Sequence, residues 1–188
     1  MDVNSIIQGY ASGYFLMTDD RGNLGWYHSR KRALIPLDKR FRYPKSLNRV
    51  LNQDRFSVAI NQDFLSVCHG CANRESTWIS PELIKIYIAL HKAGWAHSFE
   101  TWDKDKLAGG ILGIAIGGAF IGESMFYNIP DGSKVAMVKL VEHLRQRQFV
   151  LFDAQMQNAH LERFGSIVIT DLEYQELLRN AVHLSRKF

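Results

Sequence analysis

Three extended segments follow one another between residues 96 and 127, separated only by short turns. They cover residues 96–102, 107–116 and 119–127 and are rich in aromatic, aliphatic and small side chains. Residues 103–106 (Asp-Lys-Asp-Lys) and 117–118 (Gly-Gly) separate them and have the composition of hairpin turns. Consecutive strands joined by tight turns pair in antiparallel fashion. The sequence therefore predicts an antiparallel sheet at the centre of the fold.

Helical and extended segments surround this central part. Ser80, Pro81 and Glu82 form a strong helix start, because the hydroxyl caps, proline fits the first turn and the acid lies near the positive end. Further helices are predicted over residues 4–13, 45–52 and 133–148 and from about residues 62 and 171, and further strands over residues 33–36, 56–60, 149–153 and 166–169. The predicted class is α+β, with a mixed, mostly antiparallel sheet flanked by helices.

Two strand segments carry acidic side chains inside otherwise apolar sequence. Glu123 lies in the run Gly-Glu-Ser-Met-Phe, and Asp153 and Gln155 lie in the run Phe-Asp-Ala-Gln. Burying a carboxylate is costly, so two such runs favour a functional site. Residues i and i+2 of a continuous strand leave the same face, which predicts that Asp153 shares a face with Gln155, and Glu123 with Met125. The structural alternatives are a strand-end hydrogen-bonding pair and a salt bridge from Glu123, with Lys134 as a candidate partner.

The positive charge of the chain is concentrated in one segment. The net charge is +4, but residues 30–55 hold nine basic side chains against two acidic ones, whereas residues 76–188 hold twelve of each. A basic surface on a neutral body suits contact with a phosphate backbone, although a solvated basic loop has the same composition. Arg42, Lys45 and Arg49 are the candidate RNA contacts, with the last two on one face of the predicted helix.

The two cysteines, Cys68 and Cys71, form a single Cys-x-x-Cys motif. Zinc sites and redox pairs use this motif, but no second cysteine pair accompanies it and the apolar residues around it indicate one face of a short helix. We therefore interpret both cysteines as packing residues and predict no metal site. No run approaches the roughly 18 apolar residues of a membrane helix, and no signal peptide is recognisable. We expect a cytoplasmic protein with one main core and no membrane contact.

Between residues 70 and 170 a series of short motifs occurs in a fixed order. They are Thr77-Trp78-Ile79-Ser80-Pro81-Glu82, Leu90-His91 with Gly94, Ala96-His97-Ser98, Glu100 with Trp102, Gly109-Gly110, Gly122-Glu123-Ser124-Met125-Phe126, Asp131 with Ser133-Lys134, Asp153 with Gln155, and His160-Leu161. Together these motifs resemble the leucyl/phenylalanyl-tRNA–protein transferase family. The resemblance implies transfer of leucine or phenylalanine, and also methionine, from aminoacyl-tRNA to the N-terminal lysine or arginine of an acceptor protein, marking it for degradation.

The resemblance has further implications for fold and partners. It implies an acetyltransferase-like (GNAT-like) catalytic domain over residues 41–188 behind a shortened N-terminal domain over residues 1–40. No cofactor is expected, because the aminoacyl ester is already activated. A monomer is the simplest expectation for the oligomeric state.

The resemblance also makes Asp153 and Gln155 the catalytic pair. Attack of a neutral α-amine on an ester requires a proton acceptor, alignment and stabilisation of the developing oxyanion. Whether Asp153 acts as the base directly, through Gln155, or by electrostatics is open at this point. A carboxylate at Glu123 can pair with the amine or the basic side chain of the acceptor.

Substrate contacts follow from the same resemblance. Ile111, Phe120, Ser124 and Met125 are expected around the aminoacyl group, and Trp78 and Trp26 offer faces on which the terminal adenine can stack. The chain departs from the family at residues 26–32, which read Trp-Tyr-His-Ser-Arg-Lys-Arg in place of Trp-Trp-Ser-Pro-x-Pro-Arg. The contacts of Trp26 with adenine and of Arg32 with tRNA are therefore open.

Two other classes of function remain. An acyl-coenzyme-dependent N-acyltransferase needs a glycine-rich pyrophosphate loop after the strand of Phe120, where residues 127–133 contain only Gly132. A non-catalytic tRNA-binding module of the same fold is disfavoured because Glu123, Asp153 and Gln155 occur together in one chain.

Overall fold

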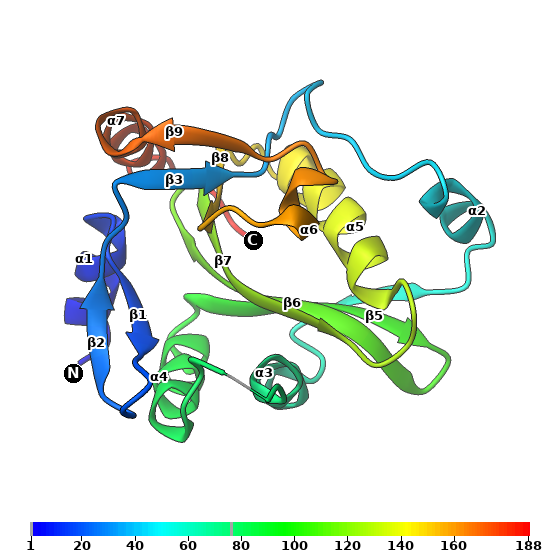
Figure 1. Cartoon of the computed structure of the whole chain (residues 1–188), viewed down its shortest axis with the longest axis horizontal. Helices are drawn as coiled ribbons and strands as arrows, with labels where there is room; N and C mark the ends of the chain where they lie inside the picture. Colours follow the sequence, from blue (N-terminus) through cyan, green and yellow to red (C-terminus); the bar gives the residue numbers. More distant parts are fainter. Residues whose placement is uncertain (1, 76) are drawn as a thin grey trace.

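The computed structural model describes residues 2–75 and 77–188 (Figure 1). Its strands are β1 (Phe15–Thr18), β2 (Leu24–Tyr27), β3 (Lys31–Leu34), β4 (Ser57–Ile60), β5 (Ala96–Asp103), β6 (Lys106–Ile116), β7 (Ala119–Tyr127), β8 (Leu151–Gln155) and β9 (Ile167–Thr170). Its helices are α1 (Val3–Ala11), α2 (Leu47–Asn52), α3 (Phe64–Ala72), α4 (Pro81–Lys92), α5 (Gly132–Gln146), α6 (Ala159–Glu162) and α7 (Asp171–Val182).

A seven-stranded sheet in the order β4-β5-β6-β7-β8-β3-β9 forms the centre of the molecule, and β1 and β2 form a separate hairpin. The pair β7 and β8 is parallel, and the other neighbouring pairs are antiparallel. The three extended segments predicted from the sequence are β5, β6 and β7. Lys104 and Gly117 lie in their turns with φ of 56° and 57°. The predicted α+β class with a mixed, mostly antiparallel sheet is confirmed.

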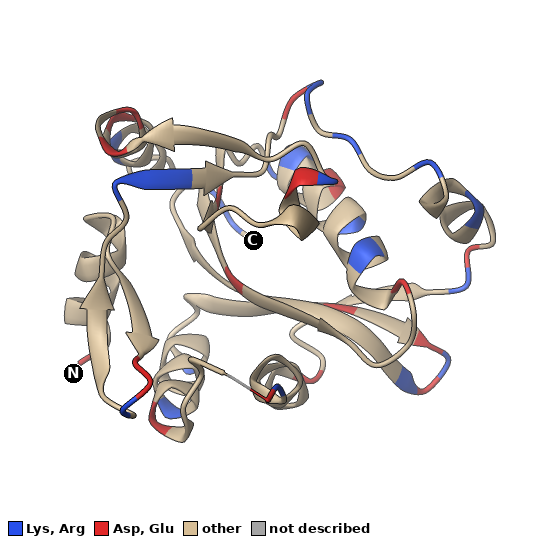
Figure 2. Ribbon diagram, in the orientation of Figure 1, with Lys and Arg blue, Asp and Glu red and all other residues tan. Residues whose placement is uncertain are grey.

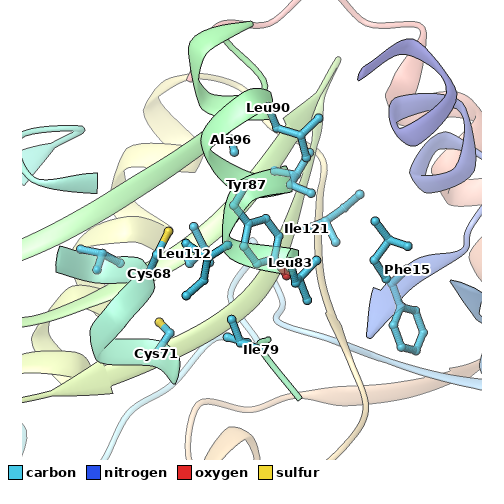
Figure 3. Packing of buried hydrophobic residues seen from close by; sticks show 14 of the residues in the cluster. Phe15, Cys68, Cys71, Ile79, Leu83, Tyr87, Leu90, Ala96, Leu112 and Ile121 are labelled. Carbon is cyan, nitrogen blue, oxygen red and sulfur yellow. The ribbon is translucent and has the colours of Figure 1, made fainter. Parts of the chain in front are cut away.

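Helices cover both faces of this sheet (Figure 1). On one face, α5 packs through residues such as Leu140 onto a core that contains Phe120 of β7. On the other face, α3 and α4 enclose a second core in which Tyr87 packs near Leu112 (Figure 3). The predicted start of α4 is confirmed, since the hydroxyl of Ser80 accepts a hydrogen bond from a backbone N–H of the first turn at 3.2 Å.

The N-terminal segment packs against the same core as α3 and α4. Ile6, Tyr10 and Phe15 belong to the buried cluster that also contains Tyr87 of α4. Figure 3 shows Phe15 and Tyr87 in this cluster. Strand β3, which lies within the predicted N-terminal domain, is an inner strand of the large sheet between β8 and β9. The domain boundary after residue 40 stays a prediction, and the segment before it contributes an inner strand, next to the edge strand β9, to the large sheet.

The strands β7 and β8 each carry one extra residue relative to a neighbouring strand. The extra residues are Glu123 in β7 and Ala154 in β8. Glu123 lies between the pairs Gly113 with Gly122 and Leu112 with Ser124. Ala154 lies between the pairs Leu34 with Asp153 and Ala33 with Gln155. Such β-bulges bend a strand and redirect its side chains. Both bulges coincide with the acidic runs recognised in the sequence.

Candidate active site

A cavity of about 720 Å³ lies where β7 and β8 separate. The parallel pairing of these strands ends at Ile121 and Asp153. Beyond that point the cavity is lined by residues 122–125 of β7 and by residues 154–161, which include the end of β8 and the segment that follows it. Residues of β1 and of the segment before α4 complete this part of the lining. A concave site of this size, largely apolar with a few polar groups, is suited to bind a small ligand or the end of a larger one.

Glu123 is the buried acid of this cavity. The hydroxyls of Tyr87 and Tyr10 donate hydrogen bonds to its Oε2 at 2.5 Å and 3.2 Å, and the amide of Gln155 donates to Oε1 at 3.0 Å. Burial raises the pKa of Glu123 to about 7, against the opposing effect of these donors. A carboxyl group with this pKa can take up or release a proton near neutral pH, as acid–base catalysis requires.

The burial of Glu123 makes the stability of the fold depend on pH. Its folded-state pKa of about 7 lies above the ordinary value of 4.5, so the folded state binds the proton more tightly than the unfolded state. The resulting stability is complete below pH 4.5 and is lost as the pH rises through 7. At about 1.4 kcal/mol per pKa unit, this loss is roughly 3 kcal/mol. Urea titrations at several pH values should show this decline for the wild type relative to Glu123→Gln, whereas parallel curves would contradict it.

Asp153 lies behind the cavity and does not line it. Its side chain is fully buried, and its two oxygens accept hydrogen bonds from the guanidinium of Arg32 at 2.7, 3.0 and 3.1 Å. The hydroxyl of Tyr174 donates to Oδ2 at 2.7 Å, and the backbone N–H of Gln155 donates to Oδ1 at 2.8 Å. Asp153 therefore anchors β3, through Arg32, and α7, through Tyr174, to the end of β8.

The side chains of Asp153 and Gln155 diverge. Gln155 adopts a left-handed backbone conformation with φ of 63°, which interrupts the extended geometry on which the predicted shared face depends. As a result, the amide of Gln155 reaches Glu123, whereas the carboxylate of Asp153 faces the buried guanidinium. The two residues remain linked through the backbone N–H of Gln155.

The predicted shared face of Glu123 and Met125 is wrong. Met125 packs against the core beneath α5, whereas the carboxylate of Glu123 is bound by tyrosines of the opposite core. The reason is the bulge at Glu123, because one extra residue inverts the alternation of the strand. The structural alternative is not observed either: Lys134 pairs with Asp131 at 2.8 Å, and no basic side chain of the described residues forms an ion pair with Glu123.

Two family profiles cover most of the chain. Residues 34–179 match that of the leucyl/phenylalanyl-tRNA protein transferase, and residues 1–30 match that of its N-terminal domain. The leucyl/phenylalanyl-tRNA–protein transferase of Gloeothece citriformis is 75% identical to this chain, over 96% of this chain and 95% of its own length. That of Rubrobacter xylanophilus is 47% identical, over 97% of this chain and 96% of its own length. The chain belongs to this family. The corresponding protein of Trichormus variabilis is 72% identical over 96% of this chain and 95% of its own length.

A solved structure shows a similar fold. L-PGS from Bacillus licheniformis aligns with a TM-score of 0.53 over 95% of this chain and 70% of that chain, at 11% sequence identity. At this identity the likeness concerns the fold alone, and the family assignment rests on the closer relatives.

Membership of the leucyl/phenylalanyl-tRNA–protein transferase family directs attention to the substrate contacts expected from the sequence. Trp78, Ile111, Ser124 and Met125 line the cavity. Phe120 does not line it, because its ring is fully buried and packs edge-on against a lining phenylalanine, with 5.2 Å between ring centroids. The structure thus brings four of these residues to one surface and places the fifth in the core.

Trp26 lies apart from the main cavity. It lines a second hollow of about 230 Å³ and packs on Tyr10 with 5.7 Å between ring centroids. Tyr10 in turn binds Glu123. Within the structure, Trp26 therefore connects to the site through Tyr10.

The candidate RNA contacts lie on the surface. Arg42, Lys45 and Arg49 are exposed and form no ion pair with any described residue. Basic residues continue along the connection from β3 to α2 and along α5 (Figure 2). Because α2 begins at residue 47, Lys45 lies in the turn before it and not in the predicted helix. Arg32 is 1% exposed and bound inside the site, so its open role as a tRNA contact is excluded.

Several residues of the site were not predicted from the sequence. Arg74, Met137 and His160 line the cavity, and Tyr174 completes the buried network around Asp153. Two of them had a recognisable signal, since Arg74 lies in the polar loop just before Trp78 and His160 belongs to one of the family motifs. Met137 and Tyr174 read as an ordinary core methionine and tyrosine in their local sequence.

Cys68 and Cys71 are free thiols buried on α3 (Figure 3). Burial raises the pKa of each thiol to about 12, so both are protonated and unreactive at neutral pH, which favours a role in packing. Within the described residues, no three side chains of His, Cys, Asp or Glu are grouped closely enough to hold a metal ion. No helix of that part of the chain has the length and apolar character required to cross a bilayer.

Proposed function

We propose that this protein transfers leucine or phenylalanine, and also methionine, from aminoacyl-tRNA to the N-terminal arginine or lysine of an acceptor protein. The observation that carries the proposal is a cavity that joins an apolar end to a buried carboxyl group with a pKa of about 7. The reaction needs room for the apolar side chain of the donor and a proton acceptor for the attacking amine. We extend the fold assignment to an acetyltransferase-like (GNAT-like) core, supported by the parallel pairing of β7 and β8 beside the cavity.

The apolar end of the cavity suits the aminoacyl side chain. Ile111, Met125, Met137 and Phe152 line it and belong to the core beneath α5. Methionine side chains are unbranched and adapt their shape, which accommodates leucine, phenylalanine and methionine in one pocket. Trp78 offers an aromatic face for the terminal adenine of the donor.

Glu123 and Gln155 are the polar groups that face the reacting atoms. We assign Glu123 as the proton acceptor because this residue lines the cavity and its carboxyl group has a suitable pKa. As the amine nitrogen bonds to the ester carbonyl carbon, the bond from that carbon to the ribose oxygen breaks. The proton released by the amine passes through Glu123 to the departing ribose oxygen. Asp153 is a positioning residue, because its carboxylate accepts a hydrogen bond from the backbone N–H of Gln155 and so fixes Gln155 in place.

The body of the tRNA is proposed to lie on the basic surface formed by Arg42, Lys45 and Arg49. We expect the double variant Lys45→Ala/Arg49→Ala to raise the dissociation constant for tRNA and to flatten its dependence on salt, because each lost phosphate contact removes roughly one unit of slope. Filter binding between 50 and about 200 mM salt measures both effects.

The matched control is Lys85→Ala/Lys92→Ala, which removes two exposed charges from α4 on the opposite face of the sheet. Its salt dependence should equal that of the wild type. Equal slopes for both double variants would place the tRNA elsewhere.

Transfer of labelled leucine tests the function directly. Leucyl-tRNA is the donor, leucyl-coenzyme A the control donor, and the acceptors are peptides that differ only in an N-terminal arginine, lysine or alanine. The proposal requires transfer from tRNA to the basic peptides alone. Transfer from the coenzyme ester would favour an acyl-coenzyme-dependent enzyme, and tRNA binding without transfer would favour a non-catalytic module.

We further propose that the protein acts as a monomer in the cytoplasm. The large sheet, both cores and the cavity are formed within one chain, which is what a monomeric enzyme requires. Sedimentation equilibrium at the concentration of the transfer assay tests the oligomeric state.

A further inference from the structure

Arg74 is the one lysine or arginine among the described residues that line the cavity. It lies in the segment between α3 and α4, and its Nη2 donates hydrogen bonds to the carbonyl oxygen of Met125 at 2.5 Å and to the hydroxyl of Ser124 at 3.3 Å. These bonds hold one edge of the guanidinium against β7. Its Nε and Nη1 donate to no described atom, and the side chain is exposed and forms no ion pair within the described residues.

A guanidinium held in this way presents its remaining N–H groups to an anion. Under the proposed function the N-terminus of the acceptor peptide is cationic, so the guanidinium of Arg74 repels it and does not bind it. The developing oxyanion of the ester forms near Glu123 and Gln155, which are buried, whereas Arg74 is exposed to water. The polynucleotide must leave the cavity through an exposed edge, and its phosphates are the anions that it carries.

We propose that Arg74 binds the phosphate that joins the last two nucleotides of the donor tRNA, while the terminal adenine lies against Trp78. This inference rests on the proposed function and adds a phosphate contact at the cavity, separate from the basic surface of α2. Arginine and an aromatic side chain four positions apart supply the two contacts that single-stranded nucleic acid requires, one for phosphate and one for a base.

Two small donors test the proposal. One is phenylalanyl-adenosine without a 5′-phosphate, and the other is the phenylalanyl ester of cytidylyl-adenosine, which contains the phosphate. The measured quantity is the ratio of kcat/KM between the phosphate-bearing and phosphate-free donors. We expect Arg74→Gln to lower this ratio by roughly tenfold or more, because the variant loses a charge-assisted hydrogen bond to the phosphate-bearing donor and none to the phosphate-free donor. The change should lie in KM, since the contact is made in the ground state as well.

Arg179→Gln is the matched control, because Arg179 is exposed on α7 and does not line the cavity. It should keep the wild-type ratio. An Arg74→Gln enzyme that loses activity equally with both donors, through a weakened β7 or a lost oxyanion contact, would overturn the proposal, as would one that loses none. A wild type inactive with both donors and with leucyl-tRNA would instead refute the proposed function, so the two failures are distinct.

Discussion

Replacing Asp153 by asparagine is expected to lower the free energy of unfolding by about 3–5 kcal/mol and to stop detectable transfer. The asparagine leaves the guanidinium of Arg32, itself 1% exposed, without its counterion in the core. It also weakens the acceptor that fixes the backbone of Gln155. Urea unfolding followed by circular dichroism measures the first effect, and single-turnover transfer of leucine measures the second. Binding of tRNA should stay near the wild-type level, because the basic surface residues are untouched.

The double variant Arg32→Met/Asp153→Asn separates the two effects of this substitution. Removing the buried cation together with the anion should restore most of the lost stability, since the cost of a broken buried pair is largely that of the uncompensated charge. Transfer should remain absent, because Gln155 is still not held by a carboxylate. A double variant as unstable as Asp153→Asn alone would show that the uncompensated charge is not the cause.

Replacing Glu123 by glutamine is expected to slow transfer by roughly 10²- to 10⁴-fold, the usual contribution of a positioned proton acceptor. Glutamine keeps the shape of the side chain and an oxygen that can accept from Tyr10 and Tyr87. For the wild type, kcat/KM should rise as the pH passes through about 7, because Glu123 accepts a proton only after its own has dissociated. The variant should lack this part of the pH profile.

The ionisation of the acceptor amine provides an internal reference for that profile. An N-terminal α-amino group has a pKa of about 7.7–8.0 and must be neutral to attack, so both enzymes should gain activity over that range. Wild type and variant therefore differ only in the limb near pH 7. If Glu123→Gln retained that limb, another group would be the proton acceptor.

Local chemical signals made much of the fold predictable. The β5-β6-β7 meander follows from its turn residues, and the start of α4 follows from Ser80 and Pro81, because these effects act over a few neighbouring residues. The acidic runs indicated the candidate site for a similar reason, since a carboxylate in an apolar strand is conspicuous in any fold. Both signals are independent of how the distant parts of the chain meet.

The arrangement within the site was not predictable in the same way. Arg32 appears in the sequence as one member of an exposed basic run, and only the sheet order, which inserts β3 between β8 and β9, brings it to Asp153. Tyr10 meets Glu123 because α1 packs on the core of α4, across 113 positions of sequence. The bulges were equally hidden, because period-two alternation assumes a continuous register.

The extra residues in β7 and β8 make chain length itself a requirement of the geometry of the candidate site. Deleting Gly122 or Glu123 would restore smooth pairing with β6 and leave the later residues of β7 with their present partners, but it would remove the extra position from which Glu123 reaches Tyr10 and Tyr87. The same holds around Ala154 for the segment that carries Gln155. Among related sequences, an alignment gap at either place would therefore be a stronger sign of lost activity than most substitutions in the surrounding core.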